Sequence, residues 1–390
     1  MPSINFTLSC RVHDSFRVQQ IAGMFDVPVA DKTTATFQAE LPELSEPWQI
    51  GLIVGPSGSG KTSVARRAFG EALYMPENAH WPQDRAVVDC FGELSVKEIV
   101  GLFTAVGFSS PPSWIKPYAV LSNGERFRCD LARALARGTI CRERPPCRSE
   151  ESAAKRNATE GVPYSSLPLV AFDEFTSVVD RNVARIGAAA VAKGIRDGRI
   201  GCRFVAVTCH YDVAEWLTPD WILDMATGRL DRRRLRRPKI EIAVQRCGAA
   251  AWAMFARHHY LNGKLNPAAR CYLATWNDVP VAFSATLCAI GKKDHWRVSR
   301  IVTLPDFQGV GIGMRLMEAV CELHRAEGKR INVTARHPAL IEHCRRSPAW
   351  RTVGVKRTGS RAADRMHNDY RGSPGRTVVS FEYVGVGATA

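Results

Sequence analysis

Short apolar runs alternate with helical patterns through the first half of the chain. Three of these runs are residues 48–55 (WQIGLIVG), 167–174 (LPLVAFDE) and 202–210 (CRFVAVTCH). A continuous apolar run of this length, bounded by glycine or polar residues, is typical of a strand that is buried on both faces of a parallel sheet. Strands that alternate with helices predict an α/β fold.

A second set of strand and helix patterns follows residue 240. Strands are predicted at 271–276, 279–287, 296–304 and 330–335, and an amphipathic helix is predicted over 311–327. A chain of 390 residues is long enough for two domains. We therefore expect an α/β domain at 1–230, a basic linker at 231–240 (DRRRLRRPKI) and a mixed α/β domain at 241–390.

The segment 141–166 is polar and has no apolar period, so we expect a mobile surface insertion there. Cys141 and Cys147 flank part of it, and an ordinary loop is the better interpretation than a metal site because no second ligand pair accompanies them. The twelve cysteines contain no C-x-x-C pair, which favours reduced thiols.

No stretch of the sequence approaches the roughly 20 uninterrupted apolar residues of a membrane-spanning helix. The first residues, MPSINFTLSC, lack the basic and then apolar order of a secretory signal. We therefore expect a cytoplasmic protein that has no membrane partner.

The excess of positive charge lies entirely in the second half of the chain. Residues 231–390 contain 28 Lys and Arg against 12 Asp and Glu, a balance of +16, and the chain totals of 53 and 38 leave 25 and 26 for residues 1–230. Such a field attracts polyanions, nucleic acid among them. A solubilising surface is the alternative explanation.

Residues 55–62 read GPSGSGKT, which fits the phosphate-binding pattern G-x-x-x-x-G-K-S/T. The pattern follows a predicted strand and opens a helix, as a loop that cradles phosphates requires. Lys61 would neutralise the β- and γ-phosphates and Thr62 would bind Mg²⁺. The expected nucleotide contacts are Gly55, Ser57, Gly58, Gly60, Lys61, Thr62 and Ser63.

Three further motifs occur in order along the chain. Asp173 ends an apolar strand, where it would help to hold Mg²⁺, and Glu174 follows as a candidate general base. Ser122 and Gly124 open a helix in LSNGE, a second candidate phosphate contact. His210 ends the third apolar run, where it would contact a γ-phosphate.

These motifs together resemble the ABC ATPase family across residues 1–230. The resemblance implies ATP and Mg²⁺ as cofactors, LSNGE as a variant of the LSGGQ signature, and His210 as the switch histidine. It also implies a head-to-tail homodimer, in which the signature of one subunit completes the ATP site of the other. Asn123 and Glu125 depart from the signature, which is a reason to expect slower hydrolysis.

A second glycine turn, DFQGVGIG, links the predicted strand 296–304 to the predicted helix 311–327. Such a turn binds pyrophosphate. Its spacing is Q-x-x-G-x-G, whereas a Rossmann dinucleotide site has G-x-G-x-x-G and a following acidic residue. The four residues of the motif are Gln308, Gly309, Gly311 and Gly313.

The turn resembles motif A of the GNAT acetyltransferase superfamily, and the resemblance covers residues 241–385. It implies acetyl-CoA or a related acyl-CoA as cofactor, with its pyrophosphate on this turn. His343 falls near the position at which the family often has a tyrosine acid, and an exposed helix residue is the equally favoured alternative.

Residues 258–264 (HHYLNGK) precede the first predicted strand of this domain. Together with that strand they resemble the Mom family of GNAT-like phage enzymes that modify adenine in DNA, and the domain order resembles ABC ATPases that are fused to a predicted acetyltransferase. His259 is a candidate base and Tyr260 a candidate stacking residue, although core packing also explains an aromatic residue here.

The sequence therefore leads to one favoured hypothesis and two alternatives. The favoured one is an ATPase that carries an acyltransferase domain and acts on nucleic acid or its bases. The first alternative is acylation of a small amine or a protein lysine. The second is a nucleic-acid-binding ATPase in which the GNAT-like domain is not catalytic.

Overall fold

The computed structural model of the protein describes residues 3–27, 32–140, 167–232, 235–259, 264–289, 291–358 and 376–385. The chain forms two compact units, each assembled from separate stretches of sequence. The first comprises Met1–Ala79, Arg137–Ser177 and Gly201–Arg236, and the second comprises His80–Ala136, Val178–Ile200 and Arg237–Ala390. The boundaries expected from the sequence, 1–230, 231–240 and 241–390, stay a prediction. The insertion 141–166 lies outside the described residues.

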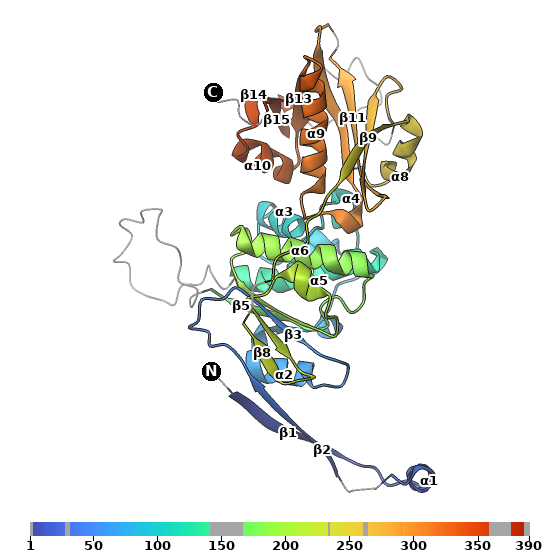
Figure 1. Ribbon diagram of the computed structural model, residues 1–390, viewed down its shortest axis with the longest axis vertical. Coiled ribbons are helices and arrows are strands. Elements are labelled where there is room, and N and C mark those ends of the chain that lie inside the picture. The colour runs from blue at the N-terminus through green and yellow to red at the C-terminus, as the bar shows by residue number, and fades with distance from the viewer. Residues whose placement is uncertain are drawn as a thin grey trace, which may run out of the picture. The chain divides into compact units, whose positions relative to one another are not determined.

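A six-stranded sheet forms the centre of the first unit (Figure 1). Its spatial order is β4 (Leu73–Tyr74), β5 (Leu169–Phe172), β6 (Arg203–Thr208), β3 (Ile50–Val54), β7 (Trp221–Asp224) and β8 (Arg229–Asp231). All neighbours are parallel except β7 and β8. The three apolar runs of the sequence are β3, β5 and β6, which lie side by side, so the predicted buried parallel strands are confirmed.

Three helices and a ribbon accompany this sheet in the first unit. Helix α2 (Lys61–Phe69) follows β3, and α7 (Val213–Leu217) follows β6. Strands β1 (Ser3–Arg11) and β2 (Lys32–Glu40) form an antiparallel ribbon, and α1 (Phe16–Phe25) lies at its far end (Figure 1).

The first stretches of the second unit are helical. They contain α3 (Val96–Ala105), α4 (Pro111–Trp114), α6 (Arg181–Arg196) and most of α5 (Asn123–Ile140). Ser95 and Glu98 form a reciprocal capping box at the start of α3, and the Asp180 carboxylate caps α6. The described 3₁₀ turns of the chain are η1 (Gly70–Ala72), η2 (Pro76–Asn78), η3 (Val87–Cys90), η4 (Tyr118–Val120), η6 (Ala249–Ala251) and η7 (Pro305–Phe307).

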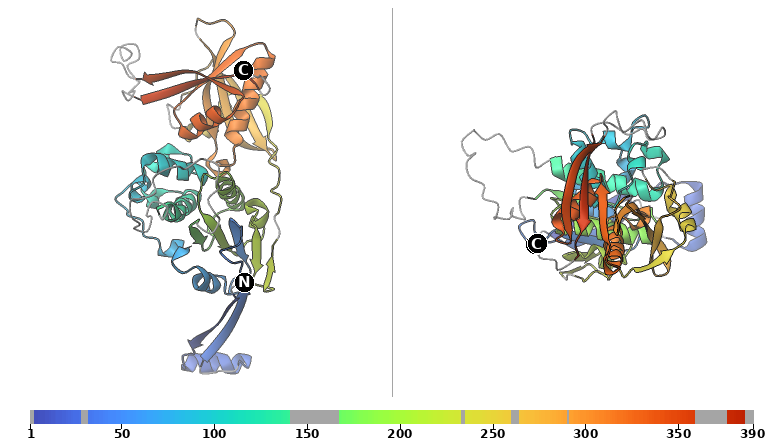
Figure 2. Two further views of the ribbon diagram at one scale, coloured as in Figure 1. Left: turned by 90° about the vertical axis from the view of Figure 1, so that its left-hand side faces the viewer. Right: turned by 90° about the horizontal axis from the view of Figure 1, so that it is seen from above.

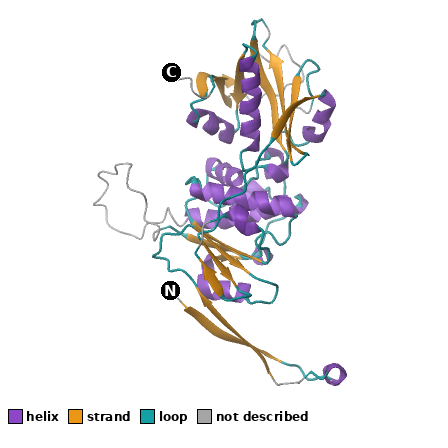
Figure 3. Ribbon diagram, in the orientation of Figure 1, coloured by secondary structure: helices purple, strands orange, loops and turns teal. Residues whose placement is uncertain are grey.

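A seven-stranded sheet forms the C-terminal part of the second unit (Figure 3). Its order is β14 (Trp350–Thr358), β15 (Arg376–Tyr383), β13 (Arg330–Ala335), β12 (His295–Thr303), β11 (Val279–Cys288), β10 (Arg270–Trp276) and β9 (Ala243–Cys247). Only β12 and β13 are parallel neighbours. This sheet confirms the predicted strands and the mixed α/β class.

Three helices accompany this sheet: α8 (Trp252–Ala256), α9 (Ile312–Ala326) and α10 (Pro338–Arg346). Helix α9 is the one predicted at 311–327, and it lies along one face of the sheet against β11, β12 and β13 (Figure 2). Its apolar stripe, which includes Leu316, Met317 and Val320, is fully buried, so burial of this face anchors the helix to the sheet.

None of the described helices has the length and apolar character that a membrane span requires.

Candidate functional site

The loop between β3 and α2 has the backbone conformation of a phosphate cradle. Gly58 and Gly60 have φ of +80° and +85°, which glycine adopts without strain. A Cβ at Gly60 would also collide with the Phe37 ring. Lys61 begins α2, is 8% exposed, and donates a hydrogen bond from Nζ to the Pro56 carbonyl at 2.8 Å. The loop therefore holds its lysine against the N-terminus of the helix.

The side-chain oxygens of Thr62 and Asp173 lie close together beside this loop. Thr62 Oγ1 donates to Asp173 Oδ1 at 3.2 Å, and the Glu174 amide donates to the same carboxylate oxygen at 3.0 Å. Burial raises the pKa of Asp173, and the hydrogen bond from Thr62 opposes that rise. A carboxylate and a hydroxyl at this separation are the hard oxygen donors that Mg²⁺ prefers.

The residues after β5 and β6 reach the same edge of the sheet as the loop after β3, because these three strands are parallel neighbours. His210 follows β6, and its Nδ1 lies 3.4 Å from Thr176 Oγ1. Glu174 and Thr176 have φ of +50° and +71°, unusual for residues with a side chain. The structure thus brings together the loop, the acidic pair and the histidine.

An unsatisfied polar atom shows that the loop suits a phosphate ligand. Ser59 Oγ is buried and has no hydrogen-bond partner among the described residues, and such atoms are uncommon in folded proteins. Ser57 and Gly58 at the loop tip are exposed. Within the described part of the chain, no group of three or more His, Cys, Asp or Glu side chains could hold a metal ion by itself.

The LSNGE segment, residues 121–125, belongs to the second unit and leads into α5. The Ser122 amide donates to Glu125 Oε2 at 2.9 Å, and Ser113 Oγ donates to Glu125 Oε1 at 2.6 Å. Burial would raise the pKa of Glu125, but the hydrogen bonds from Ser113 and Ser122 outweigh it and hold the pKa below its usual value. Glu125 therefore places a carboxylate at this helix N-terminus, near Gly124.

The second glycine turn connects β12, through η7, to α9. Gln308 fixes its start, because its Nε2 donates to the Thr303 carbonyl at 2.9 Å and its Oε1 accepts from the Ser109 amide at 2.8 Å. Gly309 and Gly311 have φ of +90° and +100°. The amides of 309–311 make no backbone hydrogen bond among the described turns and loops, and they lie at the N-terminus of α9. This conformation suits a pyrophosphate.

Part of the turn is in contact with the helical stretches of the same unit. A Cβ at Gly309 would lie 2.7 Å from Ala190 Cβ and 2.8 Å from Gly107 Cα. Lys193 Nζ lies 3.5 Å from the Val310 carbonyl, and burial lowers the pKa of this lysine. A Cβ at Gly313 would lie 2.6 Å from Thr303 Oγ1. Close packing thus favours glycine at both 309 and 313, and at Gly309 the positive φ favours it as well.

The remaining candidate residues have separate surroundings. His343 lies in α10, and its Nε2 is 2.8 Å from Glu318 Oε1 of α9; this hydrogen bond lowers the pKa of Glu318. The His259 ring contacts Trp252 edge to face at 5.6 Å. Tyr260 lies outside the described residues. The general acid and base assignments therefore stay predictions.

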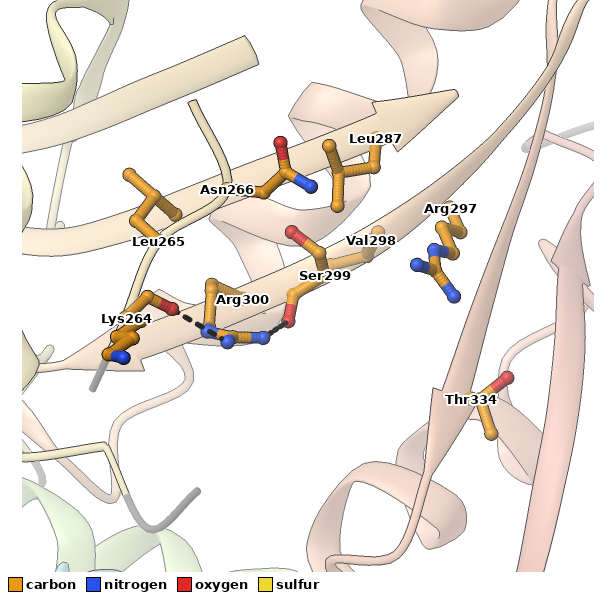
Figure 4. A pocket seen from close by; sticks show the side chains of 9 residues that line it. All are labelled: Lys264, Leu265, Asn266, Leu287, Arg297, Val298, Ser299, Arg300 and Thr334. Atoms are coloured by element: carbon orange, nitrogen blue, oxygen red, sulfur yellow. Dashed lines mark hydrogen bonds between the residues drawn. The ribbon is translucent and has the colours of Figure 1, made fainter. Parts of the chain in front are cut away.

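A pocket opens where β12 and β13 separate. The two strands pair only over His295–Val298 and Arg330–Val333, and β12 then continues to Thr303 without a partner on β13. The pocket has a volume of about 460 Å³, within the range of small-molecule sites. Figure 4 shows its lining: Lys264, Leu265, Asn266, Leu287, Arg297, Val298, Ser299, Arg300 and Thr334.

Of these lining residues, only Lys264 belongs to a segment that the sequence marks as a candidate site. Arg297 and Arg300 lie inside the pattern WRVSRIVTL, which predicts a strand and no binding site. The available signal is two arginines within an otherwise apolar strand, and in the structure Arg297 is exposed and Arg300 is half-buried.

Comparison with known proteins identifies part of the chain. The family model described as the acetyltransferase (GNAT) family matches residues 232–342. The match supports a GNAT acetyltransferase domain, with a GNAT-like fold, in the C-terminal part of the chain. No curated protein that was compared matches the chain.

Several solved structures resemble separate parts of the chain. The IAA acetyltransferase from Bacillus cereus ATCC 14579 is 12% identical over 37% of this chain and 99% of that one, with a TM-score of 0.29. A GNAT family acetyltransferase from Elizabethkingia anophelis with acetyl-CoA bound gives the same four values. A bacterial Atm1-family ABC exporter with ATP bound is 15% identical over 51% of this chain and 35% of that chain, with a TM-score of 0.33, so this chain spans about a third of the exporter.

Proposed function

We propose that the C-terminal part of the protein transfers an acyl group from an acyl-CoA to an amine. The observation that carries the proposal is the GNAT family match at 232–342, which includes both β12 and the glycine turn that opens α9. A turn with free amides at a helix N-terminus provides the donors that a pyrophosphate needs.

The chain's own residues have distinct roles in this proposal. The amides of 309–311 bind the pyrophosphate, and Gln308 holds the turn through Thr303 and Ser109. When bound, an acyl-CoA supplies an activated thioester. His343, held by Glu318, is the candidate proton donor, and His259 is the candidate base.

The first unit is proposed to bind and hydrolyse ATP. Lys61 neutralises phosphate charge, Thr62 and Asp173 hold Mg²⁺, Glu174 orients and deprotonates water, and His210 contacts the γ-phosphate. The support is the 3.2 Å contact between Thr62 and Asp173 at the loop. A head-to-tail homodimer belongs to this proposal, because the signature helix would complete the site of a second copy.

The proposed acceptor is nucleic acid or one of its bases. The support is the balance of +16 in residues 231–390, since basic surfaces bind the phosphate backbone. Retention of DNA or RNA that falls steeply with added salt is expected in a filter-binding assay. Absence of binding to either polymer at low salt would leave a small amine or a protein lysine as the acceptor.

Product analysis tests the transferase directly. The purified full chain is incubated with acetyl-CoA and, in separate reactions, with DNA, RNA, mononucleotides, polyamines and a lysine peptide, and the products are analysed by mass spectrometry. An acetylated acceptor that is not formed by heat-denatured protein is expected. Absence of product from every acceptor, together with absence of free CoA release, would contradict the activity.

The contact of Gly309 with Gly107 and Ala190 favours a second candidate function. In that case the turn serves packing within the second unit, and the protein is a nucleic-acid-binding ATPase whose GNAT-like part does not catalyse transfer. Acetyl-CoA would then leave the melting temperature unchanged at millimolar concentration, whereas a ligand that binds the native state raises it.

A further inference from the structure

A lysine from outside the region that matches the GNAT family lies at the glycine turn before α9. Lys193 belongs to α6, whereas the family match begins at residue 232. Its Nζ donates a hydrogen bond to the Val310 carbonyl at 3.5 Å, and it lies 3.2 Å from the position that a Cβ at Gly311 would take. All three residues belong to the second unit. Helix α6 therefore adds a cation to the turn 308–313.

Packing holds α6 against this turn. The 3₁₀ turn η7, which leads into residues 308–313, lies against α6. A Cβ at Gly309 would come within 2.7 Å of the Ala190 Cβ. Ala190 is three residues before Lys193, and residues with this spacing share one face of a helix. Ala190 is fully buried and Lys193 is half-buried, so the same face of α6 packs on the turn and places an ammonium group beside it.

The surroundings of the Lys193 ammonium are positively charged. It lies at the N-terminus of α9, where the helix dipole is positive. Burial is the largest cause of the lowered pKa of Lys193. Three positive charges lower that pKa further, those of Arg199, Arg237 and Arg315. Asp197 opposes them, but it is already paired with Arg199. A half-buried cation among like charges is unfavourable, and a bound anion would relieve this repulsion.

The Lys193 ammonium also has hydrogen-bonding capacity left for a ligand. An ammonium group has three donors, and among the described residues the Val310 carbonyl is the acceptor that it reaches. The amides of 309–311 make no backbone hydrogen bond among the described turns and loops. Charged and neutral donors are therefore both available at the start of α9.

We propose that Lys193 binds the pyrophosphate of the acyl-CoA together with the amides of 309–311, an inference that rests on the proposed acyltransferase function. The turn itself, QGVGIG, contains no charged residue, so it offers a pyrophosphate only neutral donors. Lysine binds phosphate as a point charge. In this chain the cation comes from α6, and the donor site is built from two segments that are more than 100 residues apart in the sequence.

Arg315, the other cation near the start of α9, is less suited to this role. Its side chain is 80% exposed, and its Nη1 lies 3.7 Å from Glu318 Oε2. An exposed cation that is paired with an acid gains little from a second anion, because solvent screens it. Lys193 is half-buried, so its charge is screened less.

Calorimetric titrations test the role of Lys193. The full chain is titrated with CoA and with dephospho-CoA, which keeps the pyrophosphate and lacks the 3′-phosphate. Mg²⁺ and a saturating non-hydrolysable ATP analogue are present, so that neither ligand occupies the turn 55–62. The same titrations are made with Lys193→Gln and with Lys193→Met, whose side chain is of similar length and uncharged. Lys97→Gln, an equal charge change at an exposed residue of α3, is the matched control.

Both Lys193 variants are expected to bind CoA and dephospho-CoA about tenfold more weakly than wild type, because a hydrogen bond between charged groups is lost. The control is expected to match wild type. The difference is expected to shrink as salt is added, since salt screens the charges. Unchanged affinity in either folded variant, or a loss that does not depend on salt, would overturn the proposal. A loss seen with CoA but not with dephospho-CoA would assign Lys193 to the 3′-phosphate and would also overturn it.

The same titrations separate this proposal from the proposed function. If wild type binds neither CoA nor dephospho-CoA, the acyltransferase proposal fails and the role of Lys193 fails with it. If wild type binds both ligands and the Lys193 variants bind them equally well, the role of Lys193 is wrong while the acyltransferase proposal stands. Circular dichroism and thermal melting confirm that each variant is folded.

Discussion

Among single residues, Glu174 has the most direct role in the proposed ATP chemistry. It follows Asp173 in the left-handed backbone region, with φ of +50°, and strained residues of this kind are often found at functional sites. Glu174→Gln is expected to bind ATP normally and to lose at least about 100-fold in hydrolysis rate, because the general base is removed. Measurements of phosphate release and of nucleotide binding test this prediction, with the exposed Glu71→Gln as control. Unchanged hydrolysis would exclude Glu174 from the role.

Glu125 offers a second test at the residue scale. Its carboxylate caps α5 through Ser122 and Ser113, and it would repel the γ-phosphate that a signature helix binds in the proposed dimer. Glu125→Gln keeps a capping side chain of the same shape and removes the charge. We expect a several-fold rise in ATP hydrolysis with an unchanged melting temperature. A fall in hydrolysis would show that the carboxylate itself assists the reaction.

The structure brings some of the candidate residues together, while the roles of all of them stay predictions. The sequence motifs singled out the loop 55–62, Asp173 and His210. The structure places them at one edge of the sheet because they follow parallel neighbouring strands. The position of Arg297 and Arg300 in a pocket could not be predicted, since the sequence does not reveal where β12 and β13 separate. The roles proposed for His343, His259 and Tyr260 stay predictions.

Among the elements, β15 carries a group that makes stability depend on pH. Glu382 is 4% exposed and pairs with Arg330 of β13 and Arg351 of β14. These pairs lower its pKa from 4.5 to about 2, with the hydrogen bond from Arg330 as the largest cause. Between pH 4.5 and pH 2, the Glu382 carboxylate takes up a proton more readily in the unfolded chain than in the folded chain. The stabilisation that the two ion pairs provide is therefore present above pH 4.5 and is lost as the pH falls toward 2.

Glu382→Gln is therefore expected to flatten the acid side of the stability profile. The contribution is at most about 3 kcal/mol by linkage, and it is smaller in practice because both arginines are exposed to solvent. Melting temperatures from pH 7 down to pH 3 measure the effect, and Glu342→Gln, in an exposed pair on α10, is the control. If the melting temperatures of wild type and Glu382→Gln fall in parallel as the pH is lowered, Glu382 is not the source of this pH dependence.

A second prediction for the secondary-structure elements concerns the turn before α9. In Gly309→Ala the new Cβ would approach Ala190 and Gly107 within 3 Å, and φ is already +90°, so we expect a loss of about 1–3 kcal/mol. Gly328→Ala has a similar φ, +72°, but open space around its Cβ, and we expect a loss of about 1 kcal/mol. Thermal melting compares the two. Equal melting temperatures for the variants would show that the close contact is absent in solution.

Elements were more predictable than their pairing. The apolar runs and the 3.6-residue period predicted β3, β5, β6 and α9 because each buries a continuous apolar face. The sequence did not reveal that residues 80–136 and 178–200 form one compact unit with 237–390. That grouping depends on contacts between distant residues, such as Ser109 with Gln308, which no local pattern encodes.

Across the whole molecule, the two glycine turns are proposed to bind two different phosphate-bearing ligands. One turn, 55–62, follows a parallel strand beside an acidic pair, and the other, 308–313, follows β12 within the region that matches the GNAT family. Acetyl-CoA also contains an adenine nucleotide, so binding at the turn 55–62 is the competing explanation for any acetyl-CoA affinity. If the two turns are separate sites, ATP and acetyl-CoA bind to the chain independently of each other.

The most direct test is a calorimetric titration of acetyl-CoA into the full chain, first alone and then with Mg²⁺ and a saturating non-hydrolysable ATP analogue. We predict binding of one acetyl-CoA per chain in both titrations, because the analogue fills only the turn at 55–62. No binding of acetyl-CoA, or binding that the ATP analogue abolishes by competition, would contradict the account.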